Sequence, residues 1–313
     1  MKRLGLLAGL AAKVAGNEFL ERLEELVDWA PLWRELAALF TATPGRWPRP
    51  PLVVFKRRLL PHCYGLSDPQ CEELVGDRRS WRRFAGLGLG LDGPVPDETT
   101  PGALPAAAGA GRPARTPARP GQRTARSPRA HPQARHAGGR HAAAGRAPRK
   151  DDPKGGDPAA DHTVKHGQPH HGFKAPVAVD EEHTAESARP SWARPASTTA
   201  AASRTWSEGT EQRVVADKAC WSRERSAWLA ERSLENGLLR RGARNRPLGE
   251  PAPTLNRFLR GVRARTEQVF GHWKRALGYR RGRYLGCRRN RLEREFKGLA
   301  WNLKRWVHLE AAA

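Results

Sequence analysis

Two acidic residues stand where a reaction site could use them. Asp217 directly follows the apolar run VVA (214–216), which predicts a short buried strand. Glu267 lies inside a helical pattern that runs from about residue 255 to residue 273. Folds that alternate strands and helices place reactive groups just after buried strands. We therefore take Asp217 and Glu267 as the first candidates for chemistry.

Basic residues flank Glu267 at helical spacing. Arg263 comes four residues before it and Lys274 seven residues after it. At about 100° per residue, the three side chains lie within roughly 40° of one another on one helix face. A carboxylate between two cations is suited to hold a divalent metal ion beside a phosphate backbone. The alternative is an ordinary Arg–Glu pair on a helix surface, which the same spacing also produces.

The composition narrows the class of protein. The chain has 313 residues and a formal net charge of +24, with an isoelectric point near 11.2. No apolar stretch is long enough to predict a membrane span, and the four cysteines include no C-x-x-C pair. Lys13 interrupts the first apolar run too early for a secretory leader. We expect a cytoplasmic protein with a polyanionic partner.

Residues 17–100 are predicted to form a compact helical region. Asn17 is a suitable N-cap, and the residues at 67–70 predict a capping box. A further helix is predicted over 52–60, where Pro61 is unfavourable for continuation. Several arginines in this region fit a helical DNA-binding module. A small helical bundle with a solvated basic rim is the alternative.

Residues 101–150 have a different composition. Ala, Arg, Pro and Gly fill 40 of the 50 positions, acidic residues are absent, and Leu104 is the one large aliphatic or aromatic residue. Such a segment cannot bury enough apolar surface to offset the entropy of ordering. We expect residues 101–147 to be disordered, together with a similar stretch at 185–207.

The remaining stretches have readable patterns. FKAPVAVD (173–180) predicts a strand, and residues 221–240 predict a helix. The basic tail at 260–306 has 15 Lys or Arg against three acids, which fits contact with a phosphate backbone. Four histidines lie within 162–171, but a glycine and a proline disfavour the helix that zinc ligation at i,i+4 spacing needs.

Several segments resemble a known family, the bacterial insertion-sequence transposases of the DDE type (groups four and five). Residues 45–100 resemble the N-terminal region of these proteins, with PVPDETT (94–100) as a specific motif. KHGQPHHGFKAPVAVDEEHT (165–184) and VVADKAC (214–220) resemble the middle of the catalytic domain. RGVRARTEQVFGHWK (260–274) is similar to the family signature in which Arg, three residues, Glu, six residues and Lys follow one another.

The resemblance implies an α/β fold with an RNase H-like catalytic domain. In that domain three carboxylates hold two Mg²⁺ ions for in-line phosphoryl transfer on DNA. By resemblance, Asp217 takes the place of the second aspartate and Glu267 that of the glutamate, both as catalytic and metal-binding residues. Arg263 and Lys274 would contact phosphate near the point of cleavage.

Two positions near the signature depart from the family. Arg260 stands where the family often has tyrosine, and Cys220 stands where tyrosine is usual. Both departures weaken the match at the site itself. Arg260 and Arg275 are the further candidates for DNA contact.

The first aspartate of the family is missing. The family has a strand like Leu-Val-Asp-Ala-Thr between segments that correspond here to 94–100 and 165–184, where this chain has its Arg/Ala/Pro/Gly run. HAGGRH (136–141) can be encoded so that a frame one nucleotide later reads Thr-Leu-Val-Asp-Ala. At the same offset, PGALP (101–105) can give Leu-Gly-Arg-Phe. ASTTA (196–200), read two nucleotides later, can give the family segment Val-His-Asp-Ser.

We interpret residues 101–147 and 185–207 as out-of-frame translation within a degenerate transposase gene. The alternative is a genuine basic insert that binds DNA. The predicted organisation is then a helical DNA-binding region (1–100), the out-of-frame segment (101–147), and an incomplete catalytic domain (148–308) with a break at 185–207.

The predicted function is that of an insertion-sequence transposase. It would bind element ends and target DNA, with Mg²⁺ as the family's cofactor, in the bacterial cytoplasm near the nucleoid and without membrane contact. Homo-oligomerisation is left open. Without the first aspartate we expect DNA binding but no strand cleavage or joining. The alternative function is that of a non-catalytic basic DNA-binding protein.

Overall fold

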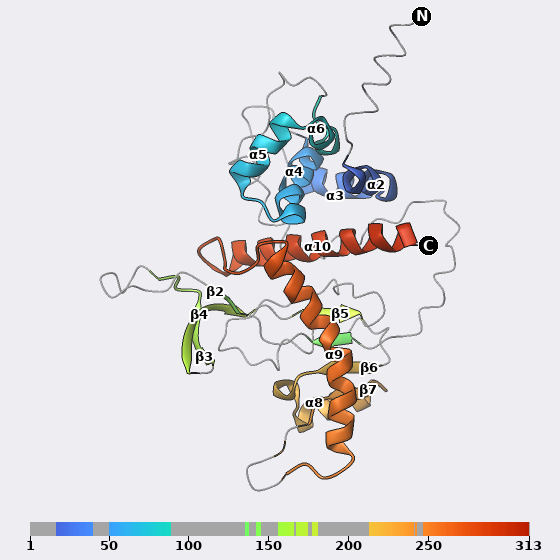
Figure 1. The fold of residues 1–313 in the computed structure, drawn as a ribbon, viewed down its shortest axis with the longest axis vertical. Coiled ribbons are helices and arrows are strands. Elements are labelled where there is room, and N and C mark those ends of the chain that lie inside the picture. The colour runs from blue at the N-terminus through green and yellow to red at the C-terminus, as the bar shows by residue number, and fades with distance from the viewer. Residues whose placement is uncertain are drawn as a thin grey trace, which may run out of the picture. The chain divides into compact units, whose positions relative to one another are not determined.

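The computed structural model describes residues 17–39, 50–88, 135–137, 142–144, 156–165, 167–174, 177–180, 213–240, 242 and 247–312 (Figure 1). The chain divides into two compact units. The first comprises Met1–Pro61, Leu66–Gly121 and Trp306–Ala313, and the second comprises His62–Gly65 and Gln122–Arg305. Each unit contains its own buried apolar residues.

The described part of the N-terminal region is helical, as predicted. Its helices are α2 (Glu18–Leu26), α3 (Ala30–Leu39), α4 (Pro51–Tyr64), α5 (Asp68–Asp77) and α6 (Arg79–Ala85). The helices bury leucine, valine and aromatic side chains, among them Leu23, Leu59 and Trp81. Burial of these apolar groups is the main contribution to the stability of the unit.

Local sequence explains where several of these helices begin. The Asn17 side chain accepts a hydrogen bond of 3.2 Å from the Leu20 backbone N–H, so the predicted N-cap is confirmed. The predicted capping box is also present. Ser67 Oγ accepts from the Gln70 N–H, and Gln70 Oε1 accepts from the Ser67 N–H.

Helix α4 continues beyond the end predicted at residue 60. Pro61 lies inside the helix, which ends at Tyr64. A proline has no backbone N–H to donate and its ring crowds the preceding helical turn, but its carbonyl can still accept a hydrogen bond. The Pro61 carbonyl accepts the Leu66 N–H at 3.0 Å. Leu59, Leu60 and Cys63 are fully buried, so tertiary packing outweighs the local cost.

The second unit contains a mixed four-stranded sheet. Its strands lie in the order β5 (Ala178–Asp180), β1 (Arg135–Ala137), β6 (Arg213–Ala216) and β7 (Glu235–Leu238). The strand β1 pairs antiparallel with β5 and parallel with β6, and β6 pairs parallel with β7. In the β1–β6 register, Ala137 lies opposite Ala216.

A smaller antiparallel sheet belongs to the same unit. Its strands lie in the order β2 (Ala142–Ala144), β4 (Gln168–Lys174) and β3 (Asp161–Lys165). The hairpin β3–β4 turns through Gly167, whose φ of +75° favours glycine. His162 lies opposite His171 in this hairpin. The histidine-rich stretch is therefore a strand pair and not a helix.

The described residues of the second unit also form α8 (Arg223–Glu231), α9 (Ala252–Arg275) and most of α10 (Cys287–Ala312). The helical pattern predicted over 255–273 is confirmed by α9. Helix α9 packs against β6, β1 and β5 (Figure 1). Among the described residues, no helix is long and apolar enough to cross a membrane.

Two predictions about regular structure differ from the structure in the second unit. The pattern FKAPVAVD predicts one strand, but Phe173 and Lys174 end β4 whereas Ala178–Asp180 form β5. Residues 221–240 were predicted as helical, but the chain forms β7 after α8. The strand was missed because its sequence, ENGL, contains Asn and Gly, which are depleted in strands.

A third difference concerns the segment predicted to be disordered. Residues 135–137 and 142–144 lie within 101–147, yet they form β1 and β2. The physical reason is that strand pairing uses backbone N–H and C=O groups, which every non-proline residue supplies. For these six residues the prediction of disorder is wrong. The rest of 101–147 and all of 185–207 lie outside the described residues.

Candidate functional site

Asp217 lies at the carboxyl end of β6, as predicted. Val215 and Ala216, the last residues of this strand, are buried. Asp217 is the N-cap of a short 3₁₀ helix (Lys218–Cys220), and its Oδ1 accepts the Lys218 N–H at 2.7 Å. The side chain keeps 30% of its surface exposed. The carboxylate is thus held in place while it stays accessible to solvent.

The neighbouring strand β7 approaches β6 closely because it has a glycine in the middle. Gly237 lies opposite Val215. A Cβ at residue 237 would stand 2.8 Å from Val215 Cγ2 and 2.9 Å from the Val214 carbonyl oxygen. Such contacts are too short for any residue with a side chain. Gly237 therefore supports the strand that presents Asp217.

Apolar packing fixes α9 beside these strands. Leu259 on α9 is buried against Val215 of β6 and Leu239 just after β7, with Val262 packed alongside. Further along the helix, a second buried cluster forms around Trp273. Most successive buried positions lie three or four residues apart, which gives α9 one apolar face.

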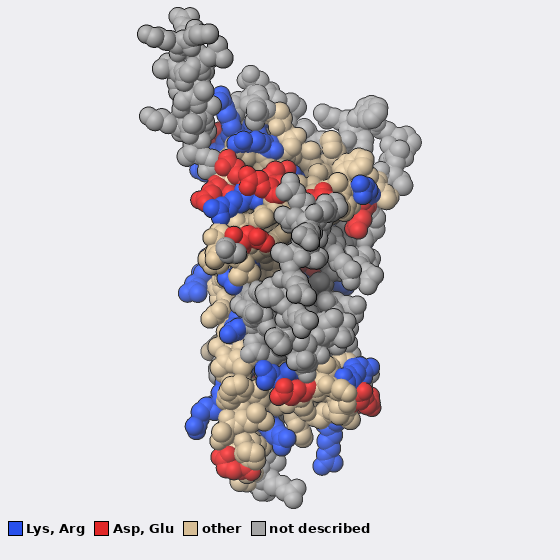
Figure 2. All heavy atoms as spheres, turned by 90° about the vertical axis from the view of Figure 1, so that its right-hand side faces the viewer, with Lys and Arg blue, Asp and Glu red and all other residues tan. Residues whose placement is uncertain are grey.

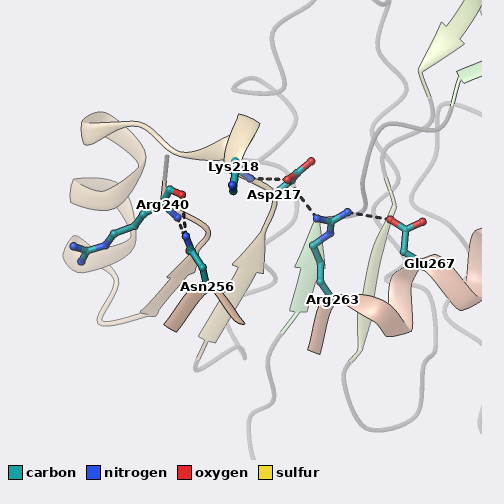
Figure 3. A network of polar contacts seen from close by, with 6 residues as sticks. All are labelled: Asp217, Lys218, Arg240, Asn256, Arg263 and Glu267. Atoms are coloured by element: carbon teal, nitrogen blue, oxygen red, sulfur yellow. Dashed lines mark hydrogen bonds and ion pairs between the residues drawn. The ribbon is translucent and has the colours of Figure 1, made fainter. Parts of the chain in front are cut away.

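A buried amide adds a polar attachment between α9 and the segment after β7. Asn256 Oδ1 accepts the Arg240 backbone N–H at 2.9 Å, and Asn256 Nδ2 donates to the Arg240 carbonyl at 3.1 Å (Figure 3). The residue is 3% exposed. Two bonds to the backbone N–H and C=O of one residue restrict both the position and the rotation of α9. The sequence contained no signal for this role, because a single Asn in a helix is common.

Arg263 joins the two predicted carboxylates. Its Nη1 lies 3.3 Å from Asp217 Oδ1, and its Nη2 lies 3.0 Å from Glu267 Oε1 (Figure 3). The contact with Glu267 is the i,i+4 pair that the sequence predicted. The contact with Asp217 spans 46 residues, and it brings the end of β6 to the face of α9. Asp217, Arg263 and Glu267 thus form one polar cluster.

The other predicted site residues lie elsewhere on α9. Lys274 is half-buried in the last turn. At about 1.5 Å per residue, it lies roughly 10 Å along the helix from Glu267. Arg260 and Arg275 are exposed. The Arg275 Nε donates to the Gly271 carbonyl at 3.3 Å.

The described residues do not complete a magnesium site. Mg²⁺ takes oxygen ligands at close to octahedral geometry. The cluster offers two carboxylates, and a guanidinium binds both of them in the place where a cation would be needed. In the part of the chain that the structure describes, no group of three His, Cys, Asp or Glu side chains could hold a metal ion.

Strand β1 shares this edge of the sheet with Asp217. Because β1 and β6 are parallel and Ala137 lies opposite Ala216, both chains leave the sheet at the same end. The residue after Ala216 is Asp217, whereas Gly138 and Gly139 follow Ala137. Residues 138–141 lie outside the described residues. The sequence alone shows that this stretch supplies no carboxylate.

Known proteins match both parts of the chain. The family model described as a transposase domain (DUF772) matches residues 9–102, and the model of the transposase DDE domain matches residues 136–303. The transposase for insertion sequence element IS1106 of Neisseria meningitidis serogroup B is 37% identical over 90 residues. The aligned part covers 29% of this chain and 31% of that relative. No solved structure matches the chain significantly.

Proposed function

The chain belongs to the DDE transposases, and on that premise we propose that it is an insertion-sequence transposase. Its proposed role is to bind the ends of its element and target DNA. The reaction class of the family is phosphoryl transfer on DNA. Because the aligned relative is covered over less than a third of its length, this role is argued from the chain's own site.

The observation that supports the proposal best is the cluster of Asp217, Arg263 and Glu267. A carboxylate at the end of a buried parallel strand faces a second carboxylate on a packed helix, and an arginine lies between them. Such a cluster can bind a phosphodiester through the guanidinium, which would exchange its carboxylate partners for phosphate oxygens. The two carboxylates would then be free to take a cation.

We further propose that this chain does not cleave or join DNA. The family site needs three carboxylates, and residues 101–150 contain none. The family model begins to match at His136, which is where the shifted reading frame would supply the missing aspartate. Two metal ions held by two carboxylates lack the ligand that places them on both sides of the scissile phosphate.

The activity test uses the full chain and a duplex that carries the element's ends. Strand nicking and joining are measured with Mg²⁺ or Mn²⁺, and the Asp217→Ala variant is measured beside the unmodified protein. We expect no difference between the two and no product above background. Product that disappears in Asp217→Ala would contradict the proposed inactivity and would assign Asp217 to catalysis.

A separate test addresses why the first aspartate of the family is missing from this chain. We propose that residues 101–147 and 185–207 are translated out of frame. The coding DNA decides this, because the shifted frames must spell Leu-Val-Asp-Ala across codons 137–141 and Val-His-Asp-Ser near codons 196–200. A coding sequence without those words would refute the frameshift.

A second candidate function is that of a non-catalytic DNA-binding protein in which the arginine-rich segment is the functional part. The ten arginines of residues 101–150, with no acidic residue among them, favour it. Deletion of 101–134 separates the two proposals, because it spares β1 and β2. Loss of most DNA affinity on deletion would support the second candidate, whereas retained affinity would support the first.

A further inference from the structure

The longest stretch without acidic residues in the described part of the second unit lies around the turn from α9 to α10. Between Glu267 and Glu293 the chain has eight Lys or Arg residues and no Asp or Glu. We call residues 274–291 the α9–α10 corner. On the face shown in Figure 2, by contrast, red acidic side chains lie among the blue basic ones.

The backbone of the corner is held in a defined shape. Asn290, which is buried, accepts the Tyr284 N–H at 3.2 Å and donates to the carbonyls of Tyr284 and Gly286 at 2.6 and 2.9 Å. Gly282 fits closely beside it, since a Cβ there would stand 2.8 Å from Asn290 Oδ1. The loop is therefore built around the amide of Asn290.

Buried charged groups secure the same loop from inside. Asp157 Oδ2 accepts the Gly286 N–H at 2.8 Å. The ammonium of Lys297 donates to the Leu277 carbonyl. Glu293 pairs with Arg283 at 3.3 Å. The charges of Asp157, Glu293 and Lys297 thus serve the loop's structure and are not available to a partner.

Other arginines of the corner point their charge outward. Arg281, Arg288 and Arg289 are exposed. Arg288 and Arg289 lie in the first turn of α10, where the helix dipole is already positive. Cations are electrostatically unfavourable at that end of a helix. An anionic partner would reverse this cost and would also meet the N–H groups of the first turn, which have no partner within the helix.

We propose that the α9–α10 corner docks on the phosphate backbone of double-stranded DNA, next to the DNA bound at the Asp217–Glu267 cluster. This inference rests on the proposed function. From Glu267 to Arg275, helix α9 rises about 12 Å, which corresponds to roughly four base pairs at about 3.4 Å each. The contact is sequence-independent, because arginine–phosphate bonds read no base edges. The loop is already ordered, so binding costs little conformational entropy.

The test removes three corner charges and compares the result with an equal loss of charge elsewhere. The corner variant is Arg281→Gln, Arg288→Gln and Arg289→Gln. The control variant is Arg223→Gln, Arg240→Gln and Arg257→Gln, three exposed arginines of the same unit. Arg280 is left unchanged, because its Nε donates to the Lys274 carbonyl at 3.2 Å.

Affinity for a labelled 30-base-pair duplex is measured by fluorescence anisotropy in EDTA at several salt concentrations. We expect the corner variant to bind about 10- to 100-fold more weakly at 0.1 M salt, with its log–log salt slope reduced by about 2 to 3. The control variant should change affinity by less than about threefold. Circular dichroism and thermal melting of both variants show whether their folds are retained.

Several outcomes would overturn the proposal. An affinity loss in the corner variant no larger than in the control would show that DNA binding depends on net charge alone, and the proposed function would then still stand. If the unmodified protein does not bind duplex DNA, the corner and the proposed function fail together. Tighter binding to an RNA of the same length would assign the corner to another partner.

Discussion

The N-terminal helices and the α9–α10 corner are both rich in basic residues, but they use the charge differently. In the N-terminal unit Lys56 is only 4% exposed and Arg57 is fully buried. In the corner, Arg281, Arg288 and Arg289 are exposed, and no acidic residue lies between Glu267 and Glu293. A count of arginines and lysines therefore does not show where a protein binds nucleic acid.

Lys56 shows how the first unit uses a cation. Its ammonium lies 2.7 and 2.8 Å from the two carboxylate oxygens of Glu24. It also lies 4.4 Å from the ring centre of Trp29 and 5.1 Å from that of Phe84. One side chain thereby connects α2, α4 and α6 with the aromatic residue before α3. Burial lowers the pKa of Lys56, while Glu24 opposes that shift.

The burial of cations in the first unit explains why the number of arginines there is a poor guide to DNA contact. The arginines of residues 17–100 predict a DNA-binding module or, as the alternative, a solvated basic rim. Arg57, Arg58 and Arg82 instead lie in the interior of their unit, whereas Arg78, Arg79 and Arg83 are exposed. The three buried side chains are therefore not part of a contact surface.

Because Cys71 is buried in the first unit, we expect its thiol to react with an alkylating reagent more slowly than the thiol of Cys287. Burial raises the pKa of Cys71 to about 11, with Arg57 partly opposing the shift. Its thiolate is thus depleted by about 100-fold relative to an ordinary thiol at pH 8, and access is blocked as well. We expect iodoacetamide to modify the half-buried Cys287 in the native protein while Cys71 reacts only after unfolding. Mass spectrometry of timed samples measures both. Rapid native labelling of Cys71 would show that this interior is open.

Breaking the ion pair of Lys56 should destabilise the first unit. Glu24→Ala leaves a buried ammonium without its carboxylate, and we expect a loss of about 2 kcal/mol, below the ~3–5 kcal/mol of a fully buried pair because Glu24 is half-exposed. Lys56→Met, which keeps the apolar packing, should cost less. Urea denaturation measures both free energies of unfolding.

The pH dependence of the Glu24→Ala variant has a definite sign. With the carboxylate gone, the pKa of Lys56 in the folded state should fall further below that of the unfolded chain. The unfolded state then binds more protons in the interval between the two pKa values, so stability rises with pH there. The loss in free energy of unfolding that the variant shows relative to the unmodified protein should therefore shrink as pH increases toward 10. A loss that does not change with pH would show that the pair matters through packing alone.

Because Asn290 holds the backbone of the corner in place, we expect its substitution to lower both stability and DNA affinity, with a smaller effect than loss of the Lys56 ion pair. Asn290→Ala removes hydrogen bonds to Tyr284 and Gly286 and leaves partly buried backbone groups without that partner. We expect a loss of about 1–2 kcal/mol in stability and weaker duplex binding, although all exposed arginines remain. Asn302→Ala, on the same helix, serves as the comparison variant. If the Asn290→Ala variant is fully folded and binds DNA with unchanged affinity, the order of the loop is irrelevant to binding.

The weakest expected effect concerns His272, beside the corner. Burial lowers its pKa, and Lys304 and Arg275 lower it further. The folded state therefore resists protonation, whereas the unfolded chain takes up a proton near pH 6.5. Stability should fall as pH drops below about 6.5, and His272→Gln should flatten that slope. Urea midpoints at pH 7.5 and 5.5 test this, with the exposed His308→Gln as the control. An unchanged slope would show that His272 is not responsible.

The sequence predicted the local parts of the fold and missed the parts that depend on distant residues. Asn17, the capping box at 67–70, helix α9 and the position of Asp217 after β6 follow from short patterns, because caps and apolar periodicity act over a few residues. Strands β1, β2 and β7 were missed, since RHA, AAA and ENGL pair through their backbones next to strands far away in the chain.

The candidate site shows the same difference between local interactions, which the sequence predicts, and interactions between distant residues, which it does not. The pairing of Arg263 with Glu267 was readable from i,i+4 spacing, and both Asp217 and Glu267 were recognised as candidates. The bond from Arg263 to Asp217 was not readable, because it joins residues 46 positions apart. The attachment of α9 through Asn256 could not be predicted either. Its partners are the backbone N–H and C=O of Arg240, which leave no trace in residue type.

The hydrogen bond between Asp157 and Gly286 has a consequence for protein synthesis. Its donor is translated 129 residues after its acceptor. At about 5–20 residues per second, the ribosome needs roughly 6 to 26 s to bridge that interval. During this time Asp157 Oδ2 lacks its Gly286 donor and must be hydrogen-bonded by water, whereas the local bond from the Ala159 N–H to Asp157 Oδ1 can already form. The second unit therefore completes its fold only when the start of the last helix has left the exit tunnel.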